Sequence, residues 1–186
     1  MSFYRVDRDL DHCMYAAFDD MDIVEKMEDF DIEGFGKPLK FKWTAPVLSF
    51  MEGDSGATTQ PDLSQWCGYD LIVSDHAKSR LDALIGDSVE YYPLICDTGS
   101  YLFANPIRQL DSAIVDIERT QSIYYNDGSF DRIEKLVLKN DQEPSAPALF
   151  TLAIDGGTTL YCTEAFRQSV EQHGLKGLRF TAIDSE

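Results

Sequence analysis

The residues best suited to acid–base or nucleophilic chemistry are three histidines and four cysteines, and they are scattered along the chain. His12 directly precedes Cys13, but adjacency in sequence does not by itself bring an imidazole onto a thiol. His76 and His173 fall in terminal turns of expected helices, where histidine is more often structural than catalytic. The sequence has no G-x-S-x-G elbow, no P-loop and no H-E-x-x-H motif. It therefore indicates no catalytic residues, although a set assembled from distant positions would escape a motif search.

The cysteines also give no sign of a metal site. Cys13, Cys67, Cys96 and Cys162 are widely spaced, without a C-x-x-C pair or a histidine at zinc-ligand spacing. We expect free thiols that pack as small hydrophobic side chains. The run Gly34-Phe35-Gly36 is too short for a dinucleotide fingerprint, so the sequence predicts no dinucleotide cofactor. Taken with the cysteine spacing, it predicts neither a metal nor a cofactor.

Charge is the strongest compositional signal. The 33 acidic and 16 basic residues give a net charge of −17. This sign excludes nucleic acid and anionic membranes as ligands, because both need a cationic surface. It favours a basic partner protein, whose encounter rate such a field would raise. The alternative is that acidity only keeps the protein in solution.

The acidic residues are concentrated near the N-terminus. Between residues 7 and 33, eleven acidic residues face only Arg8 and Lys26, a net charge of −9. Apolar residues spaced three apart between Met21 and Phe30 could form one side of a short helix with an acidic opposite side. That pattern fits a solvated helix or a docking face for a cationic partner. The candidate docking residues are Asp19, Asp20, Asp22, Glu25, Glu28, Asp29, Asp31 and Glu33.

Two tryptophans are further candidates for partner binding. Trp43 lies in the alternating stretch from Leu39 to Trp43, which predicts a half-buried strand, and Trp66 lies just before an apolar strand. Tryptophan is favoured in binding hot spots, but it is more often simply a core residue. Both readings stay open at this stage.

The fold is organised around a strand, helix and strand between residues 69 and 96. The apolar run 71–73 is followed by Ser74, a favoured N-cap residue, and by an apolar helical stripe of Ala77, Leu81, Leu84 and Ile85. Gly86 ends this helix, expected over about 75–85, and a β-branched and aromatic run follows.

An offset of 89 residues reproduces this pattern near the C-terminus. Leu71 maps onto Leu160 and Ser74 onto Thr163, which predicts a second capped helix over about 164–173 with Phe166, Val170 and His173 on one face. Gly174 is placed to end it in the left-handed conformation, and a strand follows. The repeat is either a true internal duplication or two independent units that obey the same local rules.

Most of the remaining pattern predicts strands and turns. Strands are expected near residues 3–6, 47–51, 101–104 and 149–154, with a short apolar element at 14–18. Turns at 97–99 and 126–128 predict two hairpins, residues 110–117 a buried connection, and residues 52–60 a mobile loop. The connections are short, so we expect an α+β fold with a mainly antiparallel sheet and two principal helices.

At 186 residues the chain predicts a single domain, 1–186, with an acidic segment at 1–35 followed by the region 36–186. The order of short motifs in that region resembles the myxobacterial-type immunity proteins of bacterial polymorphic-toxin and type VI secretion loci. The motifs are Gly36-Lys37-Pro38, Pro61-Asp62-Leu63, Leu71-Ile72-Val73-Ser74, Tyr92-Pro93-Leu94, Tyr101-Leu102-Phe103-Ala104-Asn105, Leu110-Asp111, Asp116-Ile117-Glu118, Leu149-Phe150, Thr163-Glu164 and Gly177-Leu178-Arg179-Phe180.

The resemblance implies a non-enzymatic protein that binds and neutralises a cognate toxin. It spans Gly36 to Ile183, so it implies no role for the acidic segment. The alternatives are a small enzyme that reverses the toxin's damage and a regulatory adaptor without catalysis. The start of the chain lacks the apolar stretch of a secretory signal, so we expect a cytoplasmic protein, while its oligomeric state stays open.

Overall fold

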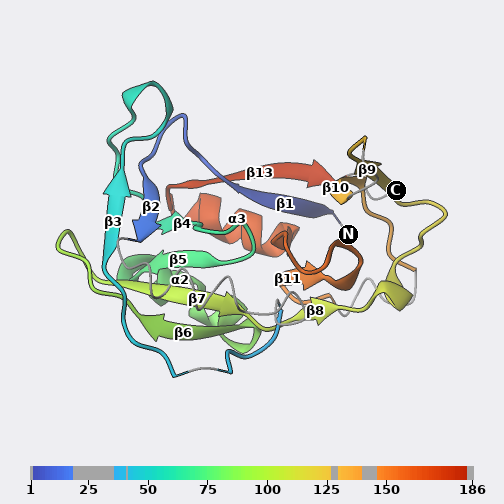
Figure 1. Cartoon of the computed structure of the whole chain (residues 1–186), viewed down its shortest axis with the longest axis horizontal. Helices are drawn as coiled ribbons and strands as arrows, with labels where there is room; N and C mark the ends of the chain where they lie inside the picture. Colours follow the sequence, from blue (N-terminus) through green and yellow to red (C-terminus); the bar gives the residue numbers. More distant parts are fainter. Residues whose placement is uncertain (1, 19–35, 41, 127–129, 140–145, 184–186) are drawn as a thin grey trace.

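A computed structural model of the chain describes residues 2–18, 36–40, 42–126, 130–139 and 146–183 (Figure 1). It has the predicted α+β fold, with two α-helices and mainly antiparallel sheets in the described residues. The elements are β1 (Phe3–Arg8), β2 (Tyr15–Phe18), β3 (Leu48–Met51), β4 (Leu63–Ser64), β5 (Leu71–Ser74), α2 (Asp75–Ile85), β6 (Val89–Pro93), β7 (Tyr101–Pro106), β8 (Gln109–Leu110), β9 (Gln121–Tyr124), β10 (Phe130–Lys135), β11 (Leu149–Leu152), β12 (Tyr161–Thr163), α3 (Glu164–Gln172) and β13 (Leu178–Ile183).

Both predicted helices are present. The Ser74 hydroxyl accepts a bond from the Ala77 amide at 3.1 Å and so caps α2, as expected. Leu84 was expected on the buried stripe but is 36% exposed, because it lies at the margin of the face that packs inward. The C-terminal helix ends one residue earlier than expected, at Gln172, and Gly174 adopts a left-handed φ of 64°.

The ends of α3 differ in detail from the prediction. Thr163 occupies the cap position but makes no side-chain capping bond. The amide of Glu164 donates instead to the Ser2 carbonyl at 3.2 Å. His173 was expected on the apolar face, but it is exposed and its Nδ1 lies 2.8 Å from the Ser169 carbonyl, so it belongs to the helix end.

The first helix belongs to a split unit in which two parallel strands flank an antiparallel one. β5 and β6, joined by α2, each pair antiparallel with β7, which lies between them. β4 adds antiparallel to the outer edge of β5, giving the order β4-β5-β7-β6. The predicted hairpin from β6 to β7 is therefore confirmed.

The second helix belongs to a unit of the same form. β12 and β13, joined by α3, each pair antiparallel with β1, and β11 adds antiparallel to β12. β8 extends this sheet in parallel with β11, giving the order β13-β1-β12-β11-β8. The central strand therefore comes from the N-terminus of the chain, whereas in the first unit it follows the last flanking strand.

The two units also share their register. Ser74 lies opposite Tyr101 in the first unit, and its counterpart Thr163 lies opposite Phe3 in the second. At the far end, Val89 lies opposite Pro106 and its counterpart Leu178 lies opposite Arg8. One offset of 89 thus relates the flanking strands and one of 98 relates the central strands. This agreement favours the internal repeat over two independent units.

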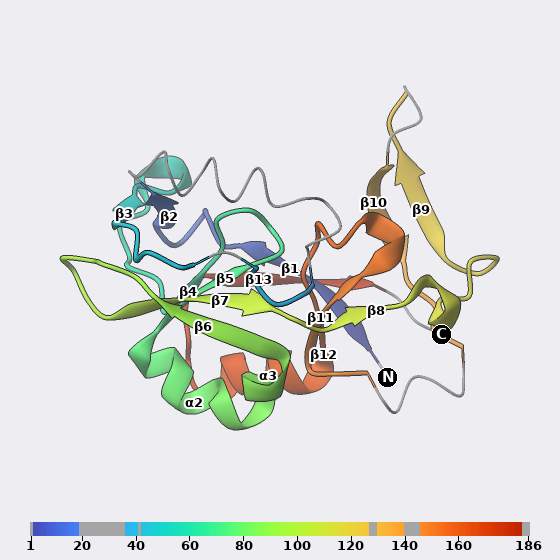
Figure 2. The same ribbon diagram turned by 60° about the horizontal axis from the view of Figure 1, so that its bottom comes forward.

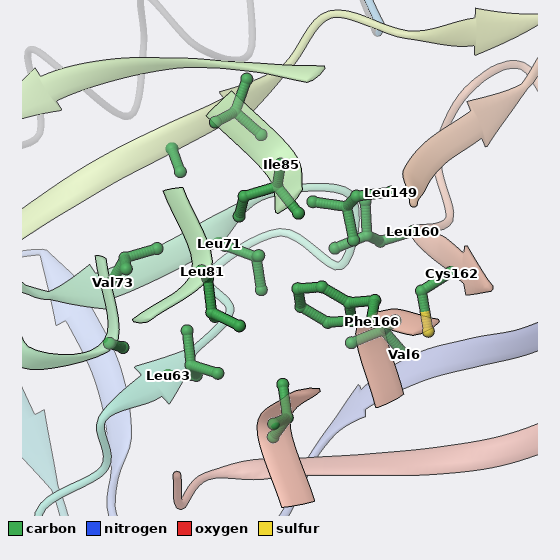
Figure 3. Close-up of a cluster of buried hydrophobic side chains, with 14 of the residues drawn as sticks. Val6, Leu63, Leu71, Val73, Leu81, Ile85, Leu149, Leu160, Cys162 and Phe166 are labelled. Carbon is green, nitrogen blue, oxygen red and sulfur yellow. The ribbon is translucent and has the colours of Figure 1, made fainter. Parts of the chain in front are cut away.

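The two units share one hydrophobic core. In Figure 2 both helices lie on the same side of the sheets, and each contributes buried side chains to a common cluster. Figure 3 shows Leu71 and its counterpart Leu160 in this cluster, together with Phe166 from α3 and Leu81 from α2. The opposite face of the β4-β5-β7-β6 sheet carries a separate cluster with β2 and β3, and that of the other sheet packs against Val115, Ile133, Leu136 and Leu138.

Two predictions need correction. The stretch from Leu39 to Trp43 forms no strand in its described residues; instead the Trp43 ring packs over the sheet, against Phe103 of β7 and Tyr92 of β6. The connection 110–117 is buried only in part: Val115 is 2% exposed, whereas Ile117, after the 3-10 turn at Ser112–Ile114, is 65% exposed. The stretch 52–60, predicted as a loop, contains a 3-10 turn at Asp54–Gly56.

The predicted hairpin of β9 and β10 is confirmed by their antiparallel pairing, although its turn at 127–129 lies outside the described residues. Within the described part of the chain, no helix has the length and apolarity needed to cross a membrane.

The repeat predicts that the chain tolerates circular permutation. Phe3 lies opposite Ile183, so a short linker that joins the chain ends would act as the β6–β7 connection does in the first unit. New ends between Asp97 and Thr98, in an exposed turn, should leave the melting temperature within a few degrees, because loop closure costs about 0.6 kcal/mol per doubling of loop length. Calorimetry measures this. New ends between Ser74 and Asp75 form the control, and equal loss of structure in both permutants would contradict the prediction.

Candidate partner-binding surface

The eight acidic residues predicted to dock a partner lie outside the described part of the chain. They are Asp19, Asp20, Asp22, Glu25, Glu28, Asp29, Asp31 and Glu33, and the short helix expected between Met21 and Phe30 lies there as well. Their role therefore stays a prediction. The structure shows where the chain enters and leaves this segment.

The described residues on either side of 19–35 are fixed by packing. Phe18, the last of them before this stretch, lies edge-on to Trp66 with ring centroids 5.1 Å apart. Gly36, the first residue after it, has a φ of 75°, and a Cβ there would lie 2.5 Å from the Thr151 hydroxyl oxygen. Because only glycine fits this approach, the chain returns at a defined point on the second unit.

Trp43 covers the outer face of the first unit. Its ring stacks on Phe103 of β7 at 5.2 Å and lies 5.0 Å from Tyr92 of β6. Its indole nitrogen donates to the Pro93 carbonyl at 2.8 Å, which satisfies a backbone acceptor on the edge strand. The half-buried ring is thus held by the sheet and presents part of its surface outward.

Trp66 is positioned by a buried carboxylate. Its amide donates to Asp70 at 2.7 Å, and the amide of Cys67 donates to the same carboxylate at 2.8 Å. Asp70 is fully buried, and this burial raises its pKa to about 6. No sequence pattern indicated this role of Asp70, since an aspartate before a strand is an ordinary turn residue.

Trp43 and Trp66 pack into the same hydrophobic cluster, although they are distant in sequence. We call the residues that cover this sheet face the aromatic cover: Phe18, Trp43, Leu48, Phe50 and Trp66. The structure thus brings the two predicted anchors into one layer. Both tryptophans are half-buried, so they are partly core residues, which is the second of the two roles considered for them.

Exposed apolar side chains border the aromatic cover. Val47 is 44% exposed, Met51 51% and Ile95 52%. Val47 and Ile95 form a parallel bridge, and the amide of Leu48 donates to the Ile95 carbonyl at 2.7 Å. We call Val47, Met51 and Ile95 the apolar rim. The sequence indicated an apolar run there but not which of its members face outward.

The neighbouring His12 and Cys13 do not form an activated nucleophile. His12 Nδ1 lies 2.9 Å from Asp9, and this contact raises the pKa of the imidazole. His12 and Cys13 both line a cleft of about 640 Å³, but Cys13 is only 2% exposed. Burial and the Asp9 charge raise the pKa of its thiol, which disfavours the reactive thiolate.

The other thiols and carboxylates give no metal centre in the described residues, where no three His, Cys, Asp or Glu side chains are grouped to hold an ion. Cys162 packs in the core as expected, but Cys67 is exposed, so its packing role was wrongly predicted. It lies in the turn held by Asp70, which accepts a hydrogen bond from the Cys67 backbone amide.

The sequence patterns also did not indicate a second buried carboxylate, that of Asp155. Asp155 is 6% exposed and accepts bonds from the Tyr161 hydroxyl at 2.7 Å and the Gly157 amide at 2.9 Å. Burial raises its pKa to about 6. Carboxylates with a shifted pKa often mark active sites, but here each hydrogen bond of Asp155 closes a local turn. Asp155 is therefore a structural residue of the loop before β12.

Asp155 predicts a measurable pH dependence of stability. Its folded pKa of about 6 exceeds the ordinary 3.8, so the folded state holds the proton more tightly and stability falls as pH rises through 6. From about pH 5 to about pH 7 this group should remove about 1.4 kcal/mol from the free energy of unfolding. Urea unfolding of Asp155→Asn should lack this contribution, whereas the exposed control Asp97→Asn should keep it. Identical pH curves for the parent and Asp155→Asn would contradict the assignment.

Comparison with known proteins leaves the family undecided: no protein-family model and no curated protein matches this sequence.

Proposed function

We propose that this protein is a cytoplasmic immunity protein that neutralises a bacterial toxin by binding it directly, without catalysis. The observation that carries the proposal is the concentration of charge: residues 7–33 hold −9 of the net −17. A cationic toxin is the partner that such a field would attract. The motif order between Gly36 and Ile183 supports the same assignment through its resemblance to immunity proteins.

In the proposed mechanism, charge speeds association with the toxin and apolar contacts slow its release. Charged surfaces raise the rate of encounter, whereas slow release depends on buried apolar contacts. The eight candidate docking residues, between Asp19 and Glu33, follow directly on Phe18, which packs against Trp66 in the aromatic cover. The apolar rim borders the same cover. A toxin drawn to the acidic segment would therefore meet exposed apolar side chains nearby.

The toxin itself is inferred only by its chemistry. Nucleases have basic clefts that hold phosphates, and an acidic protein can occupy such a cleft in place of nucleic acid. We therefore expect the partner to carry a basic surface or cleft. The product of the neighbouring reading frame is the first candidate to test.

The steering role predicts a large effect of charge reversal on association. Replacing Asp19, Asp20, Asp22 and Glu25 by lysine should lower the association rate with an inactive form of that product at least about tenfold at low salt. The dissociation rate should change less, because steering acts before contact. Stopped-flow fluorescence measures both. The control makes the same charge change elsewhere, at Asp82, Asp87, Asp97 and Glu118, and an equal loss in both variants would contradict a local docking role.

The apolar rim predicts an effect on release. Ile95→Arg should raise the dissociation rate about tenfold or more, because a charge would replace an apolar contact. The free energy of unfolding should change little, since Ile95 is 52% exposed. Ile117→Arg is the matched control, because Ile117 is 65% exposed and lies in the connection before β9. Surface plasmon resonance with equal dissociation rates for parent and Ile95→Arg would exclude the rim from the interface.

A further inference from the structure

A polar cleft of about 430 Å³ lies where the two units meet. Its walls come from β1, from β10, and from the loops at 65–68 and 158–159. The loops precede the equivalent strands β5 and β12, and they touch: the Leu160 amide donates to the Gly68 carbonyl at 3.1 Å. The cleft is therefore built from both units and is separate from the aromatic cover.

Three arginines line this cleft. Arg5 and Arg8 come from the central strand β1, and Arg132 comes from β10. The two carboxylates in the lining are Asp7 and Asp131, so the lining has one excess positive charge. This local sign is opposite to the net charge of −17. Three of the 16 basic residues of the chain thus converge on one small volume.

The arginines are only partly neutralised by their neighbours. Arg5 Nε donates to both carboxylate oxygens of Asp7, at 3.0 and 3.2 Å. Arg132 Nη1 donates to Asp131 at 2.5 Å, and its Nη2 lies 3.6 Å from Glu134. These pairs hold the two guanidinium groups in place. In the described residues they leave the two terminal nitrogens of Arg5 without a hydrogen-bond partner.

Arg8 is the least engaged of the three. Its guanidinium carbon lies 5.8 Å from the ring centroid of Tyr15, which is a cation–π distance. Across the described parts of the chain, no carboxylate lies within ion-pair distance of it. Arg8 is half-buried, so its N–H donors have limited access to water. Its positive charge also acts on the buried Asp70, whose pKa it lowers in part. A partly desolvated guanidinium that forms no ion pair in the described residues can bind a matching anion strongly.

The loops that complete the cleft are fixed by their own bonds. The Gln65 side-chain amide donates to the Gly68 carbonyl at 2.8 Å, and the Thr158 hydroxyl donates to the Asp155 carbonyl at 2.9 Å. The cleft is therefore formed before a ligand arrives, which lowers the entropic cost of binding.

We propose that this arginine cleft binds a planar carboxylate. The forked donors of arginine match the two oxygens of a carboxylate. A phosphate dianion offers the same oxygens but carries twice the charge, and the surrounding negative field opposes it more strongly. The proposal concerns the isolated chain, so it does not depend on toxin binding.

Titration of the isotope-labelled chain with acetate, a monocarboxylate, tests the proposal. At constant ionic strength, acetate should give saturable NMR shifts in the amides of Gln65, Gly68 and Thr158, with phosphate binding at least tenfold more weakly. Arg8→Gln should weaken acetate binding at least tenfold, and Arg8→Lys should restore it only in part because lysine lacks the fork. Retained amide dispersion in each variant shows that it is folded.

Arg80→Gln is the matched control, because Arg80 is exposed on α2 and its loss changes the net charge equally. This variant should bind acetate as the parent does. Shifts that do not saturate, equal weakening by Arg80→Gln and Arg8→Gln, or binding of phosphate as tight as that of acetate or tighter would each overturn the proposal. If Arg8→Gln fails to fold, Arg132→Gln provides the same comparison with a more exposed side chain.

Discussion

The structure depends on burial of one apolar layer that neither unit could form alone. Each split unit places a helix over its sheet, and the two helices meet over a common cluster that includes Leu71, Leu160, Leu81 and Phe166. Each fully buried side chain of this kind contributes about 1.5–3 kcal/mol relative to exposure. A single unit would leave its half of this cluster open to water. The loops, the aromatic cover and the arginine cleft are all positioned by this shared core.

The negative net charge and the two buried aspartates both destabilise this packed core. A net charge of −17 repels itself in the compact state, and the two buried aspartates add the cost of desolvated carboxylates. Asp70 offsets this cost with two backbone amides, and the nearby positive charge of Arg8 lowers its pKa in part. The same arginine lines the cleft between the units. Three of the 16 basic side chains therefore meet where the two units join.

The surface features separate into two regions with different chemistry. The aromatic cover and apolar rim lie on the outer face of the first unit, next to Phe18, which precedes the candidate docking residues in the sequence. The arginine cleft lies at the junction, with walls from β1 and β10. The proposed docking surface and the proposed carboxylate site are therefore lined by different residues.

The sequence by itself determined the local elements and indicated the repeated pattern, while the register of the strands decided in favour of a repeat. The cap at Ser74, the stripe of Ala77, Leu81 and Ile85 and the glycine after each helix depend on neighbours within a few residues, so they could be read from spacing. Only the tertiary structure decided which strand fills the centre of each unit, because pairing of β1 with β12 and β13 joins the two ends of the chain. It also decided that Trp43 lies over a sheet, that Ile117 faces solvent and that arginines from β1 and β10 meet. Each depends on contacts between residues far apart in sequence, and local periodicity carries no record of them.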